Sequence, residues 1–335
     1  MRRLSAARPS WLRKAKFELS ACPICGGAHA TQVTDRPALE REVERVWMFH
    51  ARRFRHPVPP IYLTDRVVFS QGPPLRLMRC AHCGHLYRNP RESAETIHRT
   101  YREDSTSDRV YDALFENQRH SFRGHARRIR RLSKGINRGL EVGSYVGGFL
   151  AAARDHGMSF SGIDVNEDAV DFCRRQGLAV AINSLEDLTG FGKYDAVAIW
   201  NTFEQLPNVR SAAIACRRLL QDGGLLALRV PNGSFYARWR RHLNGPLAPL
   251  AERMLAHNNL LGFPYREGFT KRSMHRLLSD TGFEIRRVHG DTLVRIADRW
   301  TNTGGAIDEL VTKTIERVIQ RGWRAPWVEV YAVAR

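Results

Sequence analysis

The stretch Leu140–Leu150 constrains the chain most, because it joins a short apolar segment, a glycine-rich turn and the start of a helix. It predicts a buried strand, a turn through Gly143 and Gly147, and a helix that opens a βαβ unit. Nucleotide-like ligands bind at such helix N-termini, where backbone N–H groups are free. Dinucleotide-binding turns place a glycine against the pyrophosphate, but here Tyr145 takes that place. Tyr145 and the carboxylate of Glu141 therefore disfavour a pyrophosphate and suit a cationic ligand with an ammonium group.

A second acidic residue supports this interpretation. Asp164 ends the next predicted strand, Ser159–Val165. A carboxylate at the end of the second strand can accept hydrogen bonds from both ribose hydroxyls. S-adenosylmethionine (SAM) carries an ammonium group and a ribose and has no phosphate, so it fits both acids.

Four segments in this order resemble a class I SAM-dependent methyltransferase from about Gly139 to Phe283. They are Glu141-x-Gly143-x-x-x-Gly147, Gly162–Val165, Tyr194–Pro207 and Leu219–Leu225. The resemblance implies an α/β fold, with a Rossmann-like sheet covered by helices on both faces. It also implies methyl transfer from SAM. Because the sulfonium methyl is already activated, the protein mainly aligns the acceptor.

The resemblance assigns ten residues to SAM binding. They are Glu141, Gly143, Ser144, Tyr145, Gly147, Asp164, Val165, Ser184, Leu185 and Asn201. The turn approaches the methionine part, and Glu141 organises the turn and the ammonium end. Asp164 takes the ribose hydroxyls, Val165 lies against the adenine, and the backbone of Ser184 and Leu185 lines the adenine edge. Asn201 borders the methionine end.

The resemblance is incomplete at the position where related enzymes often carry a Glu-His pair. This chain has Glu204-Gln205, and a glutamine cannot titrate. We expect the amide of Gln205 to orient the acceptor by hydrogen bonding. Glu204, His257 and Tyr265 are weaker candidates for a general base, and for each of them a structural role is favoured.

Two Cys-x-x-Cys-Gly segments supply the pattern of a structural zinc site. They hold Cys22 with Cys25 and Cys80 with Cys83. Four thiolates suit closed tetrahedral zinc, whereas a redox pair or unpaired buried thiols are the alternatives. We expect His82 and His85, which flank the second segment, on the surface. The segment resembles the zinc-ribbon head that precedes many bacterial methyltransferase domains.

These patterns predict three regions. Residues 1–103 form a zinc-ribbon head with a helical insertion that starts near Asp35 and Pro37, and residues 104–138 form a helical linker that packs on the core. Residues 139–335 form the methyltransferase domain, with a lid or acceptor-binding insertion at 233–269.

The predicted core strands are Leu140–Gly143, Phe160–Val165, Leu178–Ile182, Ala196–Trp200 and Leu225–Val230, with helices at 148–156, 167–175 and 209–220. Trp327–Ala334 is expected to close one edge of the sheet, and the resemblance implies that it runs antiparallel. Shorter strands are expected at Ile61–Leu63, Arg66–Phe69 and Val294–Ile296.

The net charge of +19 is concentrated in the first 140 residues, which hold 28 Lys and Arg against 13 Asp and Glu. This excess permits contact with nucleic acid, an acidic lipid surface or a phosphorylated substrate, and it also follows from simple arginine-rich composition. No apolar run reaches the roughly 18 residues of a membrane span, and no secretory signal is recognised. Together with the Cys-x-x-Cys pairs, this favours a reducing cytoplasm.

The leading hypothesis is a methyltransferase that acts on a small-molecule acceptor, with a sugar or glycolipid intermediate as the main example. An RNA methyltransferase with a basic zinc-ribbon head is the first alternative, weakened by the absence of an aromatic and basic RNA-binding module. A non-catalytic SAM-binding scaffold is the second. No pattern in the sequence specifies an oligomeric state.

Overall fold

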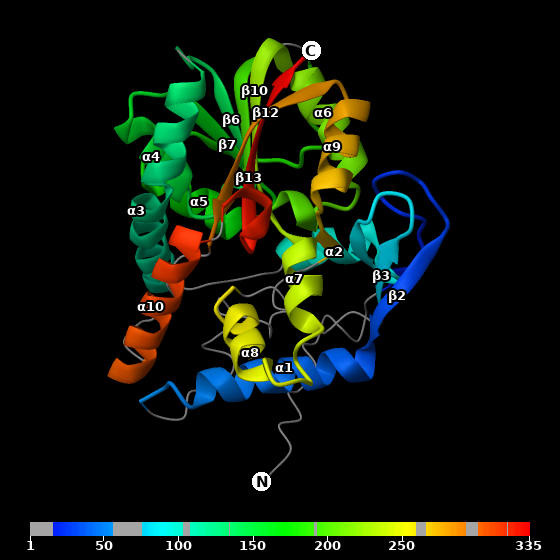
Figure 1. Cartoon of the computed structure of the whole chain (residues 1–335). Coiled ribbons are helices and arrows are strands. Elements are labelled where there is room, and N and C mark those ends of the chain that lie inside the picture. The colour runs from blue at the N-terminus through cyan, green and yellow to red at the C-terminus, as the bar shows by residue number, and fades with distance from the viewer. Residues whose placement is uncertain are drawn as a thin grey trace. The chain divides into compact units, whose positions relative to one another are not determined.

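The structure is a computed structural model, and it describes residues 16–55, 76–102, 108–133, 135–190, 193–258, 266–292, 301–319 and 321–335 (Figure 1). The chain forms two compact units. The first, here called the cysteine unit, comprises Met1–Ser93, Val230–Met274 and Val288–Glu329. The second, the sheet unit, comprises Ala94–Arg229, His275–Arg287 and Val330–Arg335.

Seven strands form one sheet in the order β12-β13-β10-β9-β6-β7-β8. They are β6 (Gly139–Val142), β7 (Phe160–Asp164), β8 (Val180–Ile182), β9 (Tyr194–Trp200), β10 (Leu220–Pro231), β12 (Phe283–Asp291) and β13 (Trp327–Ala334). The strands from β10 to β8 pair in parallel. The central strand β6 is buried along its length, as in a parallel sheet covered on both faces. The predicted α/β sheet is thus confirmed.

The prediction that Trp327–Ala334 closes the sheet edge is wrong. Strand β13 lies between β10 and β12, and seven of its eight residues are buried. The partly exposed β12 forms the edge instead. Alternating side chains suggested one solvated face, but both neighbours of β13 are strands. Its antiparallel direction stays a prediction.

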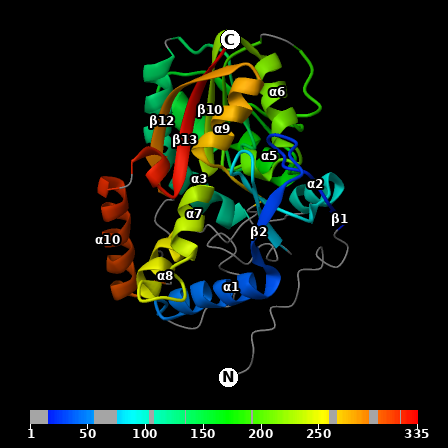
Figure 2. The ribbon, with the colours of Figure 1, turned by 45° about the vertical axis from the view of Figure 1, so that its right-hand side comes forward.

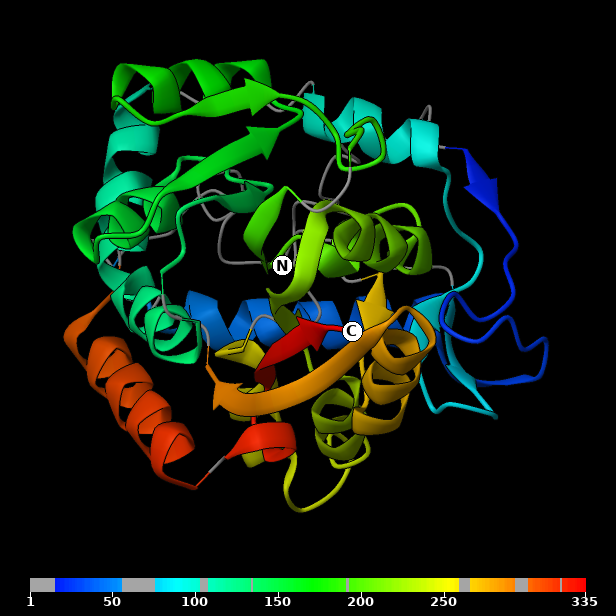
Figure 3. The ribbon, with the colours of Figure 1, turned by 90° about the horizontal axis from the view of Figure 1, so that it is seen from above.

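Helices cover both faces of the sheet (Figure 3). Helices α3 (Asp108–Leu132), α4 (Gly148–Asp155) and α5 (Glu167–Arg175) lie on one face, and α6 (Val209–Leu219) and α9 (Lys271–Asp280) lie on the other. Phe122, Ala126 and Ile129 of α3 pack with Phe149 of α4 in one apolar cluster. The helix of the predicted linker thus turns these apolar residues toward the core.

The cysteine unit is built on a four-stranded sheet in the order β11-β4-β3-β2. Its strands are β2 (Ala30–Asp35), β3 (Arg76–Cys80), β4 (Leu86–Arg88) and β11 (Glu267–Gly268), and β1 (Phe17–Glu18) pairs separately with β5 (Arg91–Glu92). Its helices are α1 (Arg36–Ala51), α7 (Gly233–Arg240), α8 (Ala248–Ala256) and α10 (Thr303–Ile319). Asp35 caps α1 by accepting from the amide of Ala38, and Pro37 occupies the first turn, as the sequence predicts.

The boundaries of the two units differ from the boundaries of the three predicted regions. Strand β11 pairs with β4 antiparallel, with Glu267 opposite Tyr87 and Gly268 opposite Leu86. This pairing joins the end of the predicted insertion 233–269 to the cysteine-bearing sheet, and the insertion falls within the cysteine unit. Helix α2 (Ala94–Arg102), predicted as the end of the head, belongs to the sheet unit.

Some expectations fall outside the described residues. These are the strands Ile61–Leu63, Arg66–Phe69 and Val294–Ile296 and the candidate base Tyr265. Among the helices that the structure describes, none combines the length and apolar character needed to cross a bilayer.

Candidate functional site

The order of the strands locates a candidate site in the sheet unit. Strand β6 pairs with β7 on one side and with β9 on the other, so the strand order reverses between β6 and β9. Ligands of open α/β sheets bind outside the carboxyl ends of the strands at such a switch point. The predicted SAM residues Glu141, Asp164 and Asn201 stand at or near the ends of β6, β7 and β9.

The turn after β6 requires glycine at its first position. Gly143 has φ 72°, and a Cβ there would lie 2.4 Å from Oγ1 of Thr202. The amides of Gly143 and Ser144 both donate to the carbonyl of Ile163 on β7, over 2.9 and 3.1 Å. The turn is thereby fixed to the neighbouring strand and ends at Gly147, the N-cap of α4.

Two residues of the site have a strained backbone. Tyr145 (φ 46°) and Asn201 (φ 54°) are the non-glycine residues with positive φ in the described ranges. Such conformations are uncommon and concentrate at functional sites. They follow the neighbouring strands β6 and β9, which singles out this edge of the sheet.

Asp164 stabilises the strained turn. Its Oδ2 accepts from the amide of Tyr145 over 2.8 Å, and its Oδ1 accepts from the amide of Asn166 over 3.0 Å. Burial raises the pKa of Asp164, and these two amides oppose the rise. Each carboxylate oxygen keeps a further lone pair, so the group can still accept from ribose hydroxyls.

Three buried side-chain oxygens near the ends of β6 and β9 have no hydrogen-bond partner within the described chain. They are Oε2 of Glu141, Oδ1 of Asn201 and Oε2 of Glu204. Burial raises the pKa of Glu141 well above its usual range, and repulsion from Asp164 adds to the rise. Buried acceptors without donors are costly, so a ligand rich in N–H groups would stabilise this edge. The ammonium group of SAM fits that requirement.

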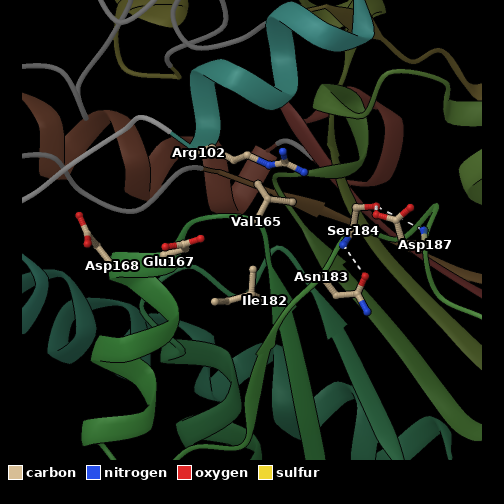
Figure 4. Close-up of a pocket in the computed structure, with 8 residues that line it drawn as sticks. All are labelled: Arg102, Val165, Glu167, Asp168, Ile182, Asn183, Ser184 and Asp187. Carbon is tan, nitrogen blue, oxygen red and sulfur yellow. Dashed lines mark hydrogen bonds between the residues drawn. The ribbon is translucent and has the colours of Figure 1, made fainter.

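A cavity of about 420 Å³ lies next to Val165 (Figure 4). It is lined by Arg102, Val165, Glu167, Asp168, Ile182, Asn183, Ser184 and Asp187. Val165 and Ser184 are predicted adenine-contacting residues, and the structure brings them together. Ile182 is 47% exposed although it is a large aliphatic side chain on β8. A flat apolar group such as adenine could cover it.

Several lining residues were missed in the sequence. Arg102 comes from α2, which the sequence assigns to the head, so no local pattern connects it with the cavity. Ile182 ends a predicted strand and could have been found by its position. The predicted Leu185 is buried and does not line this cavity. Its backbone role stays a prediction.

The side-chain amide of Gln205 is hydrogen-bonded through both its oxygen and its nitrogen within the sheet unit. Its Oε1 accepts from the hydroxyl of Tyr101 on α2 over 2.6 Å, and its Nε2 donates to the carbonyl of Asn201. The carbonyl of Tyr101 in turn accepts from Nδ2 of Asn166 over 3.0 Å. Gln205 thus connects α2 to the strained residue Asn201. A methyl acceptor that is oriented by the amide of Gln205 would have to replace one of these hydrogen bonds.

The two other described candidates for a base are both buried. Burial raises the pKa of Glu204 to about 8, with partial compensation from the hydrogen bond with Gln205 and the charge of Arg229. His257 belongs to the cysteine unit, where burial and the charge of Lys313 lower its pKa to about 3. Its Nε2 lies 3.4 Å from Oδ2 of Asp308, which indicates a structural role.

The cysteine unit brings the four predicted ligands together. The Sγ atoms of Cys22, Cys25, Cys80 and Cys83 all lie within 4.8 Å of one another. Thiolates about 2.3 Å from a tetrahedral zinc stand about 3.8 Å apart, so the cluster fits this metal. The amides of Gly26 and Gly84 donate to the carbonyls of Cys22 and Cys80, and both glycines have positive φ. Both predicted turns are therefore formed.

One expectation about the flanking histidines is wrong. His82 is exposed as predicted, but His85 is fully buried. Its Nε2 lies 2.6 Å from Oε2 of Glu267, and its Nδ1 lies 3.3 Å from Oγ of Ser273. Strand β11 brings Glu267 to β4, a contact that the sequence around His85 does not indicate.

Known proteins resemble the chain in sequence and in fold. A ubiquinone biosynthesis O-methyltransferase of Methylococcus capsulatus is 33% identical over 106 residues, which cover 29% of this chain and 45% of that protein. This match spans less than half of that relative. A SAM-dependent methyltransferase structure from Thermotoga maritima is 15% identical, with 68% of this chain and 95% of that chain covered and a TM-score of 0.45. One from Archaeoglobus fulgidus is 17% identical, with 67% and 99% covered and a TM-score of 0.44.

A family model described as a methyltransferase domain matches residues 114–288, which is just over half of the chain. The matched range contains the glycine turn, Asp164, Asn201 and Gln205. The chain therefore belongs to the methyltransferase domain family.

The thiol cluster predicts one zinc ion per chain. We expect metal analysis of protein purified under reducing conditions to give one equivalent of zinc, and Cys80→Ser to lose it. Cys216→Ala is the control, because Cys216 lies on α6 outside the cluster. Chelation should loosen the cysteine unit and leave SAM binding largely intact. Zinc-free protein, or equal loss in the control, would contradict the assignment.

The substitution Glu141→Gln should raise the stability of the ligand-free protein and lower its affinity for SAM. The folded-state pKa of Glu141 is raised, so the free energy of unfolding falls as pH rises from the usual glutamate pKa toward the folded value. At pH 7 the neutral amide avoids this penalty, and we expect a higher melting temperature without ligand. SAM should bind more weakly, because the amide cannot ionise against the ammonium.

Thermal melts at pH 4 and pH 7, with calorimetry of SAM binding, test this. The exposed Glu186→Gln should change neither quantity. A variant that binds SAM as tightly as the wild type would remove Glu141 from the ammonium site.

Asp164→Ala should weaken SAM binding by about 1.5–3 kcal/mol, the range for charge-assisted hydrogen bonds. Asp164→Asn is the matched variant, because it keeps an oxygen for the amide of Tyr145 and loses the charge. We expect an intermediate affinity for it by calorimetry. Equal affinities of wild type and both variants would show that Asp164 does not contact the ribose.

Proposed function

We propose that this methyltransferase acts on a small-molecule acceptor, with a sugar or glycolipid intermediate as the leading class. The observation that carries the proposal is the group of donor-free oxygens of Glu141, Asn201 and Glu204 beside a strained turn. It supports a SAM site of the family type. The partial similarity to a ubiquinone biosynthesis O-methyltransferase supports a small acceptor.

In the proposed complex, residues at the ends of different strands contact different parts of SAM. Glu141 and Asn201 hold the ammonium end, and the carboxylate of Asp164 accepts from the ribose hydroxyls. Val165 and Ile182 cover the adenine. The bound cofactor supplies a methyl group already activated on a sulfonium. The residues of the chain therefore need to align the acceptor and to manage its proton.

Glu204 limits proton transfer at neutral pH. Its pKa is raised to about 8 by burial, so only the minority of the carboxyl groups that are ionised at pH 7 can accept a proton there. Gln205 cannot accept one at any working pH. We therefore propose that alignment dominates the rate, with the bond from Tyr101 to Gln205 fixing the loop after β9.

Gln205→His tests whether alignment dominates. We expect turnover to change by less than about tenfold, or roughly 1.4 kcal/mol in barrier, without a new ionisation near neutral pH. Tyr101→Phe removes the hydroxyl that donates to Gln205 and should lower turnover by a similar factor. A pH–rate profile on the true acceptor measures both. A gain above roughly a hundredfold with a new pKa near 7 would show instead that the chain lacks a catalytic base.

The acceptor class can be tested directly. Purified protein is incubated with methyl-labelled SAM and a cell extract, and the label is then separated by mass and by solubility in organic solvent. We expect label in the low-mass or lipid-soluble fraction. Label in a ribonuclease-sensitive fraction would favour the RNA alternative, which the basic first 140 residues motivate. No labelled product, despite SAM binding, would favour a scaffold.

A further inference from the structure

Helix α10 of the cysteine unit is amphipathic, but its charged side chains are buried and its aliphatic side chains are exposed. The buried positions include the charged residues Glu309, Lys313 and Glu316. The large aliphatic side chains are exposed instead: Ile307 57%, Leu310 47%, Val311 47%, Ile315 45%, Val318 64% and Ile319 60%. They recur three and four residues apart and so form one stripe along the helix, here called the α10 apolar face. Contiguous apolar patches of this kind mark interaction sites.

A buried polar network fixes the orientation of α10. Nζ of Lys313 donates to Oδ1 of Asn258 over 3.0 Å and to the carbonyl of His257, and it lies 3.5 Å from Oε2 of Glu316. Nδ2 of Asn258 donates to Oε1 of Glu316 over 2.7 Å. Breaking a buried charge pair is strongly destabilising. The helix therefore cannot turn its aliphatic side chains inward.

The first turns of α10 are held as firmly. Asp308 pairs with Arg53 over 3.2 Å and with Arg253 of α8 over 2.5 Å. Gly305 packs closely against Arg53, because a Cβ added to Gly305 would lie 2.8 Å from the Cβ of Arg53. Figure 2 shows α10 beside α8 within the cysteine unit. The outward aliphatic face is thus a consequence of the fold.

One exposed arginine lies on α10, and further arginines follow the helix in the chain. Arg317 is the charged residue among the exposed positions of α10, and exposed Arg321 and Arg324 follow it in the chain. Nη2 of Arg238 donates to the carbonyl of Arg324 over 3.2 Å. Burial lowers the pKa of Arg238, and the charges of Arg241 and Arg324 lower it further. No ion pair joins any of these five arginines to a carboxylate within the described ranges.

We propose that the α10 apolar face and the arginines that follow it form a peripheral docking surface for an anionic lipid bilayer. An interfacial helix lies in the membrane plane with its aliphatic side chains at the boundary of headgroups and acyl chains, and nearby arginines attract anionic headgroups. A second copy is less complementary, because two chains of net charge +19 repel each other. The proposal goes beyond methyl transfer and does not depend on the acceptor.

Vesicle flotation of the full-length protein tests the proposal. One set of vesicles is phosphatidylcholine, and the other is an equal mixture of phosphatidylcholine and phosphatidylglycerol. We expect binding to the anionic vesicles, weaker binding at high salt, and little binding to the neutral ones. Ile315→Glu should lower the partition coefficient at least about tenfold, because it replaces inserted aliphatic surface with charge.

Ile214→Glu is the matched control, since Ile214 is 52% exposed on α6 of the sheet unit. It should bind vesicles like the wild type. Both variants should keep their melting temperature and SAM affinity, which excludes misfolding. Equal vesicle binding by wild type and Ile315→Glu, or no binding by wild type, would overturn the proposal.

Light scattering without vesicles measures the oligomeric state and so tests whether a second copy of the chain occupies the α10 apolar face. A wild-type dimer that Ile315→Glu dissociates would identify a second copy as the occupant and overturn membrane docking. Hydrogen exchange of α10 should slow when anionic vesicles are added. Unchanged exchange would show that the helix does not meet the bilayer.

Discussion

The hydrogen bond from the amide of Tyr145 to Asp164 is the contact on which the candidate site depends. A tyrosine in the left-handed region is strained, so the turn after β6 persists only because its surroundings fix it. The carbonyl of Ile163 holds the two preceding amides, and Asp164 holds the third. One strand thus positions the turn of its neighbour, and the residue proposed to bind the ribose also shapes the loop for the ammonium end.

The cysteine unit follows a different principle. Its sheet is short, and its strands come from distant parts of the chain, with β11 about 180 positions after β4. The cluster of four thiols, the pair of His85 and Glu267, and the network around Lys313 each bring together residues that lie far apart in the chain. Charged residues in this unit therefore lie inside, and on α10 the aliphatic residues lie outside.

Local patterns predicted the features that depend on local physics. The glycine turn, Asp164, the helix cap at Asp35 and the two cysteine turns are each specified by a few adjacent residues, and the structure contains them all. The contacts that were missed join distant residues. His85 is buried against Glu267, which lies 182 positions away in the sequence. The amide of Gln205 is bound by Tyr101, which lies 104 positions away. Neither partner can be found from hydrophobic periodicity. The interior place of β13 also depends on which strands flank it.

The buried carboxyl of Glu141 has a consequence for the thermodynamics of ligand binding. With a raised pKa and no donor at Oε2, the group keeps its proton to a higher pH than an ordinary glutamate in the absence of a cation. Ionisation against an ammonium group would release that proton into solution. The measured binding enthalpy would then include the ionisation heat of the buffer and would differ between phosphate and Tris. Affinity would rise with pH until Glu141 is ionised without the ligand, so a single carboxyl group would couple cofactor occupancy to the acidity of the surroundings.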